Sequence, residues 1–339
     1  MKLLQYFNTQ PQDAPNTWLF PHPLAWATLA GMGTILYIWS KVTGFQFTSE
    51  ELPSGLLPLS LPLFASIWCM YRKLLPVFSY FTFTLIFIIG VNVILKSGNC
   101  LGVAFAFPLV DVQMAAFDQM IGFDWPSHIR WVNDHALVSK ILGKTYYSLN
   151  AIMLLTVLTL FAFHRYDQLK EILILVFFTG VATLILGAIW PAIGAYGYYD
   201  LAPADISNLP ASAGRFYHNQ FLAIRDGSLR ALDLSHYKGL VQFPSFHTVM
   251  ALLTTWAVRH TIIFWPMALI NAVMIVSTLS YGGHHLADVF GGMAVTAFAI
   301  WVYRAVPDSY LSPAATSKEL PDWLRKAIFR LTSAQRETV

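Results

Sequence analysis

Charged residues are scarce in this sequence: they make up 12% of it, whereas a soluble domain usually carries roughly 25%. Cysteine is scarcer still, and the spacing of Cys69 and Cys100 fits neither a disulfide framework nor a zinc site. The formal net charge of +3 is too small to indicate a nucleic-acid partner. These shortages exclude the disulfide-stapled and nucleic-acid-binding classes and make lipid the expected solvent.

Hydrophobic residues, in contrast, make up 56% of the chain and gather in long runs. A helix that crosses a bilayer needs roughly 20 mostly apolar residues, and backbone groups in lipid must be paired. We therefore predict an all-α, polytopic membrane helix bundle of about eight spans. The expected spans are 23–40, 56–71, 76–95, 147–163, 170–190, 244–258, 261–279 and 285–303.

Basic residues in short loops indicate the orientation, because such loops stay cytoplasmic. With eight spans, Arg72, Arg165, Arg259 and Arg304 all fall on the side that holds both termini. We expect a multi-pass protein of a bacterial inner membrane, with both termini in the cytoplasm. The long connections between spans, and the histidine motifs beside them, would then face the periplasm.

Two histidine motifs stand at the mouths of apolar helices. His284 and Asp288 are four residues apart, so they share a face of a helix. The aspartate can accept a hydrogen bond from one ring nitrogen and leave the other free as a nucleophile. Pro244, Ser245 and His247 mark another helix start, where unpaired N–H groups bind anions and the histidine can donate a proton. This set suits phosphoryl transfer through a covalent phosphohistidine.

The residues alone leave other interpretations open. A histidine at a membrane interface is commonly a hydrogen-bonded spacer, and clusters rich in histidine can bind zinc. A polar site between spans is also typical of a transporter. One further feature concerns packing: Gly291 and Gly292, one turn beyond Asp288, predict a tight contact between helices.

The segments "FPSFH" and "GGHHLADVFGG" resemble the type 2 phosphatidic-acid phosphatase superfamily. The P-S-x-H signature of that superfamily matches Pro244, Ser245 and His247. Its H-x-x-x-D signature matches His284 and Asp288. Both motifs stand in the family's order, at span ends on the same side of the expected membrane.

The resemblance covers roughly residues 147–304 and implies a six-helix-type phosphatase core. In such a core His284 would be the nucleophile and Asp288 its partner. His247 would protonate the leaving group, and Ser245 would bind the phosphoryl oxygens. The substrates would be membrane lipids, and neither a metal nor a cofactor would be needed.

Two arginines that the family usually uses to clamp phosphate are missing, because Thr278 and Trp190 stand at the matching places. The branch that resembles fungal inositol-phosphorylceramide synthase has the same losses and also looks similar in "FPSFH" and the doubled histidine. We therefore expect metal-independent transfer of a head group between lipids, sphingolipids included. A plain phosphatase of phosphatidic acid or polyprenyl phosphate is the alternative, and a non-catalytic transporter or scaffold on the same fold is a second one.

Positive charge for the phosphate is expected instead from the loop before Phe243. Arg225, Arg230 and Lys238 lie there, and we expect at least one of them to reach the phosphate. The alternative is that they are solvated or bind anionic lipid head groups.

Two more segments complete the expected site. Tyr198, Tyr199 and Asp200 are expected to line the same cleft. Asp118 and Trp125 are expected to shape the lipid entrance, unless Trp125 is only an interfacial anchor.

Three parts of the chain follow from this interpretation. Residues 1–110 would be accessory N-terminal spans, and residues 111–304 would form the catalytic membrane core. Residues 305–339 would form a cytoplasmic, amphipathic tail on the inner leaflet.

Overall fold

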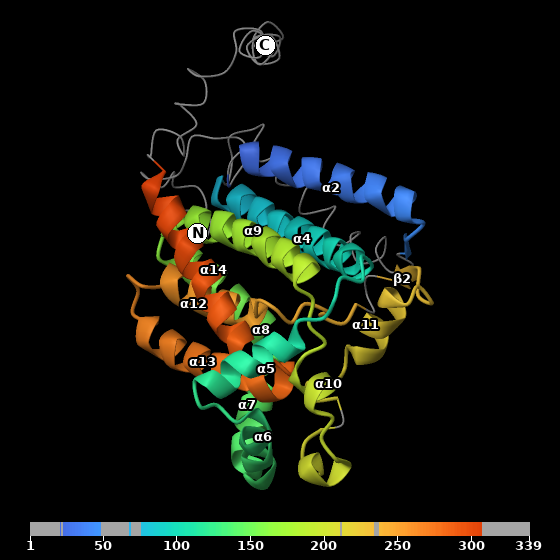
Figure 1. Ribbon diagram of the computed structural model, residues 1–339. Helices are drawn as coiled ribbons and strands as arrows, with labels where there is room; N and C mark the ends of the chain where they lie inside the picture. Colours follow the sequence, from blue (N-terminus) through green and yellow to red (C-terminus); the bar gives the residue numbers. More distant parts are fainter. Residues whose placement is uncertain are drawn as a thin grey trace, which may run out of the picture. The chain divides into compact units, whose positions relative to one another are not determined.

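The protein is described by a computed structural model that places residues 21, 23–48, 68, 76–210, 212–233 and 237–306. Most regular elements among them are helices (Figure 1). The longer ones are α2 (Pro23–Thr43), α4 (Pro76–Val103), α8 (Leu149–Ala162), α9 (Tyr166–Ile189), α12 (Phe246–Ala257), α13 (Phe264–Ser277) and α14 (Leu286–Ala305). The shorter ones are α5 (Asp111–Met120), α6 (Trp125–Asp134), α7 (Ala136–Tyr146), α10 (Ala195–Tyr199), η1 (Pro203–Ile206), α11 (His218–Arg225) and the π-helix η3 (Thr278–Gly282).

Two three-residue strands are the exception to this helical pattern. β1 (Gln46–Thr48) and β2 (Ala231–Asp233) pair in parallel, with Gln46 opposite Ala231. The predicted all-α membrane bundle is confirmed.

Four of the described helices are long and apolar enough to cross a bilayer. They cover Ser79–Val103, Tyr166–Ile189, Phe264–Gly282 and Leu286–Ala305. The pair α7 and α8, bent by 55°, makes a fifth if it counts as one span. The protein is therefore an integral membrane protein.

The described helices yield fewer spans than the eight that were predicted. The predicted span 244–258 forms α12, which has only 12 residues. At 1.5 Å per residue it rises about 18 Å, less than the roughly 30 Å of a hydrocarbon core. The predicted span 56–71 lies outside the described residues except for Trp68, and so does most of the predicted tail 305–339.

Small residues let α4 and α9 pack side by side, as Figure 1 shows. A Cβ added to Gly98 of α4 would collide with the side chain of Leu184, and one added to Gly180 of α9 would come within 2.6 Å of Leu95. Association in lipid depends on such close contact, because lipid is as apolar as the helix surface. α4 in turn packs on α2, and α9 packs on α12.

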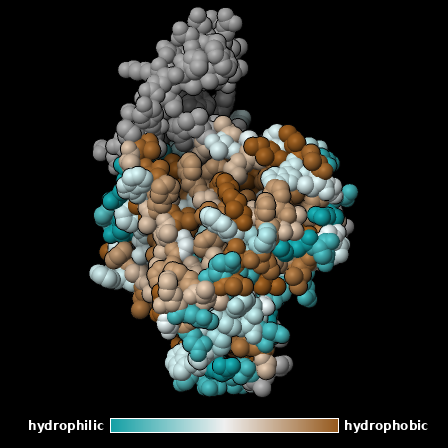
Figure 2. Space-filling model, viewed as in Figure 1, coloured by the Kyte–Doolittle hydropathy of each residue, from teal (hydrophilic) through white to brown (hydrophobic). Residues whose placement is uncertain are grey.

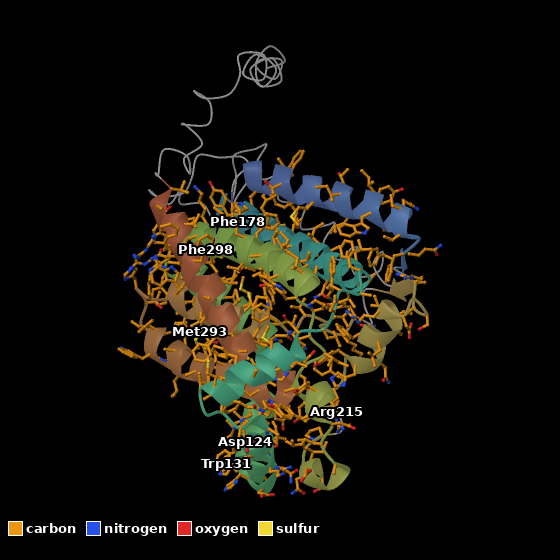
Figure 3. The ribbon with its side chains drawn as sticks, in the orientation of Figure 1. Asp124, Trp131, Phe178, Arg215, Met293 and Phe298 are labelled. Carbon is orange, nitrogen blue, oxygen red and sulfur yellow. The ribbon has the colours of Figure 1, made fainter. Side chains whose placement is uncertain are left out.

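On the face that Figure 2 shows, apolar residues predominate over the body of the helices, and hydrophilic residues gather at one end. Phe178 of α9 and Phe298 of α14 are 61% and 64% exposed, and both lie on the apolar part with Met293 (Figure 3). Asp124 and Arg215 lie at the hydrophilic end, near α6 and α10. Large exposed apolar side chains on long helices are those that face lipid.

A buried cluster joins this hydrophilic end to the spans. Trp125, at the start of α6, is 0% exposed and packs with Tyr196 of α10 and Tyr281 of η3. Its Nε1 donates hydrogen bonds to the carbonyl oxygens of Leu279 and His284, at 3.2 and 3.0 Å. The interpretation of Trp125 as an interfacial anchor or entrance residue is therefore wrong. The indole is buried, and its hydrogen bonds hold the backbone of Leu279 and His284 in place.

Candidate active site

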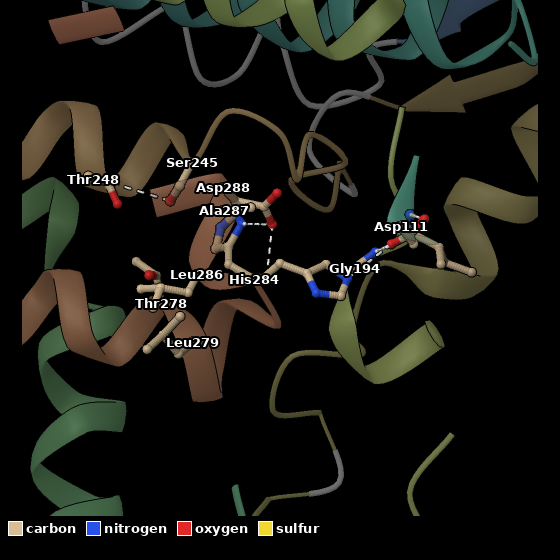
Figure 4. Close-up of polar contacts among 12 residues, drawn as sticks. Asp111, Gly194, Ser245, Thr248, Thr278, Leu279, His284, Leu286, Ala287 and Asp288 are labelled. Carbon is tan, nitrogen blue, oxygen red and sulfur yellow. Dashed lines mark hydrogen bonds and ion pairs between the residues drawn. The ribbon is translucent and has the colours of Figure 1, made fainter. Parts of the chain in front are cut away.

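His284 and Asp288 come together at the start of α14, by a geometry that differs from the one expected. The helix begins at Leu286, so His284 precedes it and does not share a helical face with Asp288. The two side chains still meet, with 3.2 Å between Nδ1 of His284 and Oδ2 of Asp288 (Figure 4). Gly283, with φ of 74°, adopts a left-handed conformation that favours glycine, and this turn brings the imidazole back over the helix start.

Asp288 is fixed by its own helix. It is the third residue of α14, and its Oδ2 also accepts a hydrogen bond of 2.9 Å from the backbone N–H of His285. A carboxylate here satisfies an N–H that a helix start leaves unpaired, and it lies favourably in the helix dipole. The orientation of His284 is fixed with it. When Nδ1 carries the proton and donates a hydrogen bond to Asp288, Nε2 keeps the lone pair that a nucleophile needs.

The other motif forms the start of α12. Ser245 is the N-cap residue, and its buried Oγ accepts a hydrogen bond of 3.4 Å from the N–H of Thr248. The ring of His247, in the first turn, stacks on Tyr146 with 4.2 Å between ring centroids. The backbone N–H of Ser245 donates to the carbonyl oxygen of Asp288 at 3.0 Å, which ties α12 directly to α14.

Glycines bring these two helices close, as the sequence predicts. A Cβ on Gly292 would lie 2.7 Å from the carbonyl oxygen of Ser245, and one on Gly291 would lie 2.5 Å from the ring of Phe243. Any larger residue at these positions would push the two histidine motifs apart.

Both histidines line one cavity of about 380 Å³. Its walls come from α4, α8, α9 and α12, together with the segment before α12. Several lining side chains are polar although they lie among apolar helices: Asn92, Lys96, Asn99, Asn150, Thr183, Tyr237 and Gln242. A cavity of this size suits a small ligand or the head group of a lipid.

His285 belongs to a second, buried cluster that sequence reasoning missed. Its ring lies between two carboxylates: Nε2 is 3.5 Å from Oδ1 of Asp111, and Nδ1 is 3.5 Å from Oδ2 of Asp118. Asp118 also accepts hydrogen bonds from the N–H groups of Leu286 and Ala287, at 3.0 and 2.8 Å. Asp118 therefore caps α14 from another helix and does not shape a lipid entrance.

Asp111, on the other side of His285, also binds backbone N–H groups. Its carboxylate accepts hydrogen bonds of 2.9 and 2.8 Å from the N–H groups of Ile193 and Gly194 (Figure 4). The cluster thus ties α5, the start of α10 and the start of α14 together. Within the described ranges, no group of three or more His, Cys, Asp or Glu side chains is placed to hold a metal ion.

This cluster predicts a pH-dependent contribution to stability. Burial lowers the pKa of His285, but the carboxylates of Asp111 and Asp118 outweigh it and raise the pKa to about 9, from 6.5 when unperturbed. Since the pKa is higher in the folded state, the charged ring stabilises the fold fully below about pH 6.5, and this contribution is lost as the pH rises through about 9.

We expect His285→Gln to lower the melting temperature in detergent most at about pH 6, with a gap from the native protein that narrows toward about pH 9. His260→Gln, which changes an exposed histidine beyond the other end of α12, serves as the control. A gap that stays constant between these pH values would contradict the paired, charged state of His285.

The three basic residues proposed for the phosphate do not line the cavity. Arg225 donates a hydrogen bond of 2.8 Å to the carbonyl oxygen of Phe107, and Lys238 is exposed. The carbonyl oxygen of Arg230 accepts a hydrogen bond from Gln46, beside the strand pair. The described residues that line the cavity include one lysine, Lys96 of α4, and no arginine.

The tyrosines expected in the cleft pack instead around the buried cluster. Tyr199 stacks on Trp125 with 5.5 Å between ring centroids, and the ring of Tyr198 lies 5.8 Å from that of His285. Asp200 ends α10 in a left-handed conformation and is exposed. The rings of Tyr198 and Tyr199 therefore lie beside His285, and none of the three residues lines the cavity.

Comparison with protein families matches residues 112–302, more than half of the chain, to the PAP2 superfamily. The chain belongs to the PAP2 superfamily. Both histidine motifs fall inside the match, whereas α2 and α4 lie outside it. No curated protein and no solved structure matches the chain. Membership makes this PAP2 protein a membrane enzyme of the lipid phosphatase and phosphotransferase kind.

Proposed function

We propose that this PAP2 protein transfers a phosphorylated head group from one membrane lipid to the hydroxyl of another, through a phosphohistidine at His284 and without a metal. The arrangement of His284 carries the proposal. Asp288 holds Nδ1 at 3.2 Å, which leaves Nε2 for the cavity that His247 also lines.

In the first half of the reaction, Nε2 of His284 attacks the phosphorus of the donor phosphodiester. A P–N bond forms while the P–O bond to the leaving lipid alcohol breaks. His247, as an imidazolium, gives its proton to the departing oxygen. The charge that develops on the ring of His284 is balanced by the carboxylate of Asp288.

In the second half, the hydroxyl of the acceptor lipid attacks the phosphorus of the phosphohistidine. His247, now neutral, takes the proton of that hydroxyl, and the P–N bond breaks. Ser245 contributes at the start of α12, where unpaired N–H groups favour the phosphoryl oxygens. Both half-reactions then use the same four residues.

The lining of the cavity supports transfer over hydrolysis. Its walls are mostly membrane helices, which limits the access of water to the phosphohistidine. A plain phosphatase acting on phosphatidic acid or polyprenyl phosphate would need water at the same place, and it is the competing function. The proposed setting is a bacterial inner membrane, with cytoplasmic termini and the site toward the periplasm, because the basic short loops then lie inside.

Acid-quenched labelling tests the proposal. The purified protein is incubated with lipid phosphodiesters that carry radioactive phosphate, and the label on protein is measured. We expect acid-labile, base-stable label that ceramide or diacylglycerol removes faster than water does. Loss of label to water alone would favour the phosphatase. No label, with donors that are shown to bind, would favour a transporter or scaffold.

A further inference from the structure

α4 contributes one wall of the cavity although it lies outside the family match. Asn92, Lys96 and Asn99 all line the cavity, at steps of four and three residues. These steps place the three polar side chains on one face of the helix. An apolar membrane helix therefore contributes a polar stripe to the cavity that His247 and His284 also line.

Lys96 is the positive charge in this stripe. It lies within the span Ser79–Val103, where an ionisable side chain is costly and therefore indicates function. Its Nζ lies 5.7 Å from the ring centroid of Tyr237, which lines the same cavity. The long apolar stem of lysine carries the ammonium from the helix into such a polar space.

Unsatisfied acceptors among the side chains that line the cavity indicate that it receives a ligand. Among the described residues, Oδ1 of Asn99 and Oε1 of Gln242 are buried without a hydrogen-bond partner. Both side chains line the cavity and are 9% and 3% exposed. Buried amide oxygens are seldom left unpaired, so a ligand that brings hydrogen-bond donors fits here.

We infer that Lys96 binds the substrate phosphate and takes the place of the two absent arginines. The inference rests on the proposed phosphoryl transfer at His284. One ammonium balances the single charge of a phosphodiester, whereas the doubly charged phosphomonoester requires more. The substrate class is therefore a monoanionic lipid phosphodiester.

Equilibrium binding of an uncleavable analogue tests this role separately from turnover. The probe is a short-chain lipid phosphonate monoester, in which carbon replaces the bridging oxygen of the scissile bond and the charge stays at one. We expect Lys96→Gln to weaken binding by about 10- to 100-fold, because a hydrogen bond to a charged group is lost. Lys96→Arg keeps the charge and should bind within a few-fold of the native protein.

Lys140→Gln, on the exposed side of α7, is the matched control and should bind normally. Melting temperatures measured without the analogue show that each variant is folded. Equal binding by native protein and folded Lys96→Gln would overturn the inference, as would a loss of binding confined to Arg225→Ala, Arg230→Ala or Lys238→Ala.

The two proposals fail in different ways. If binding depends on Lys96 but no phosphohistidine forms, the phosphate site stands and the proposed reaction falls. If label forms on His284 but Lys96→Gln binds the analogue as the native protein does, the reaction stands and the assignment of Lys96 falls.

Discussion

Replacing His284 by alanine should abolish the phosphorylated protein and lower turnover by about 10⁴- to 10⁶-fold, the range in which hydrolases lose activity when a catalytic centre is disabled. The reason is structural. Asp288 holds Nδ1 of His284 in a hydrogen bond, so Nε2 is the nitrogen of this ring that remains for the phosphoryl group. The measurement is acid-quenched labelling alongside the rate of head-group release.

The control is His260→Ala, because His260 is exposed beyond the far end of α12. It should label and turn over as the native protein does. Labelling that survives in His284→Ala would show that another residue is the nucleophile. Folding of His284→Ala is verified through its melting temperature and its retained binding of the uncleavable phosphonate.

Replacing His247 by glutamine should lower turnover of lipid donors by about 10²- to 10⁴-fold, the usual contribution of a general acid or base. The loss should depend on the leaving group. A lipid alkoxide is a poor leaving group and needs the proton of His247, whereas nitrophenolate leaves without one. We therefore expect His247→Gln to label nearly normally from a nitrophenyl phosphodiester.

Comparison of the two donors in His247→Gln and in Lys140→Gln makes this test specific. A misplaced cavity wall would slow both donors alike, whereas loss of a general acid slows only the lipid donor. If the two donors are slowed equally, His247 acts through its stacking on Tyr146, at 4.2 Å, and not as an acid.

Much of the fold and the centre of the site could be predicted because they depend on local patterns. Long apolar runs reveal α4, α9, α13 and α14, since the length of a hydrophobic run decides whether it spans lipid. The motifs around His247 and His284 identified both helix starts, and Gly291 and Gly292 revealed their close contact. Each of these properties belongs to neighbouring residues.

Proximity in the sequence did not indicate which basic residue lies at the cavity. Arg225, Arg230 and Lys238 precede the FPSFH motif closely, yet they lie outside the lining of the cavity. Lys96 lies far away along the chain and reaches the cavity. The predicted span ended at Leu95, immediately before it, because a lysine ordinarily terminates an apolar run.

By itself, the sequence determined that this chain is a helical membrane protein with paired histidine motifs, because hydrophobic length and motif spacing are written in consecutive residues. Only the tertiary structure decided what surrounds those histidines. Helix packing places Asp111 and Asp118 beside His285, and it places Trp125 where its indole N–H donates to the carbonyl oxygen of His284. Contacts between residues more than 100 positions apart depend on how helices pack, and packing is a property of side-chain shape across elements, which no local pattern specifies.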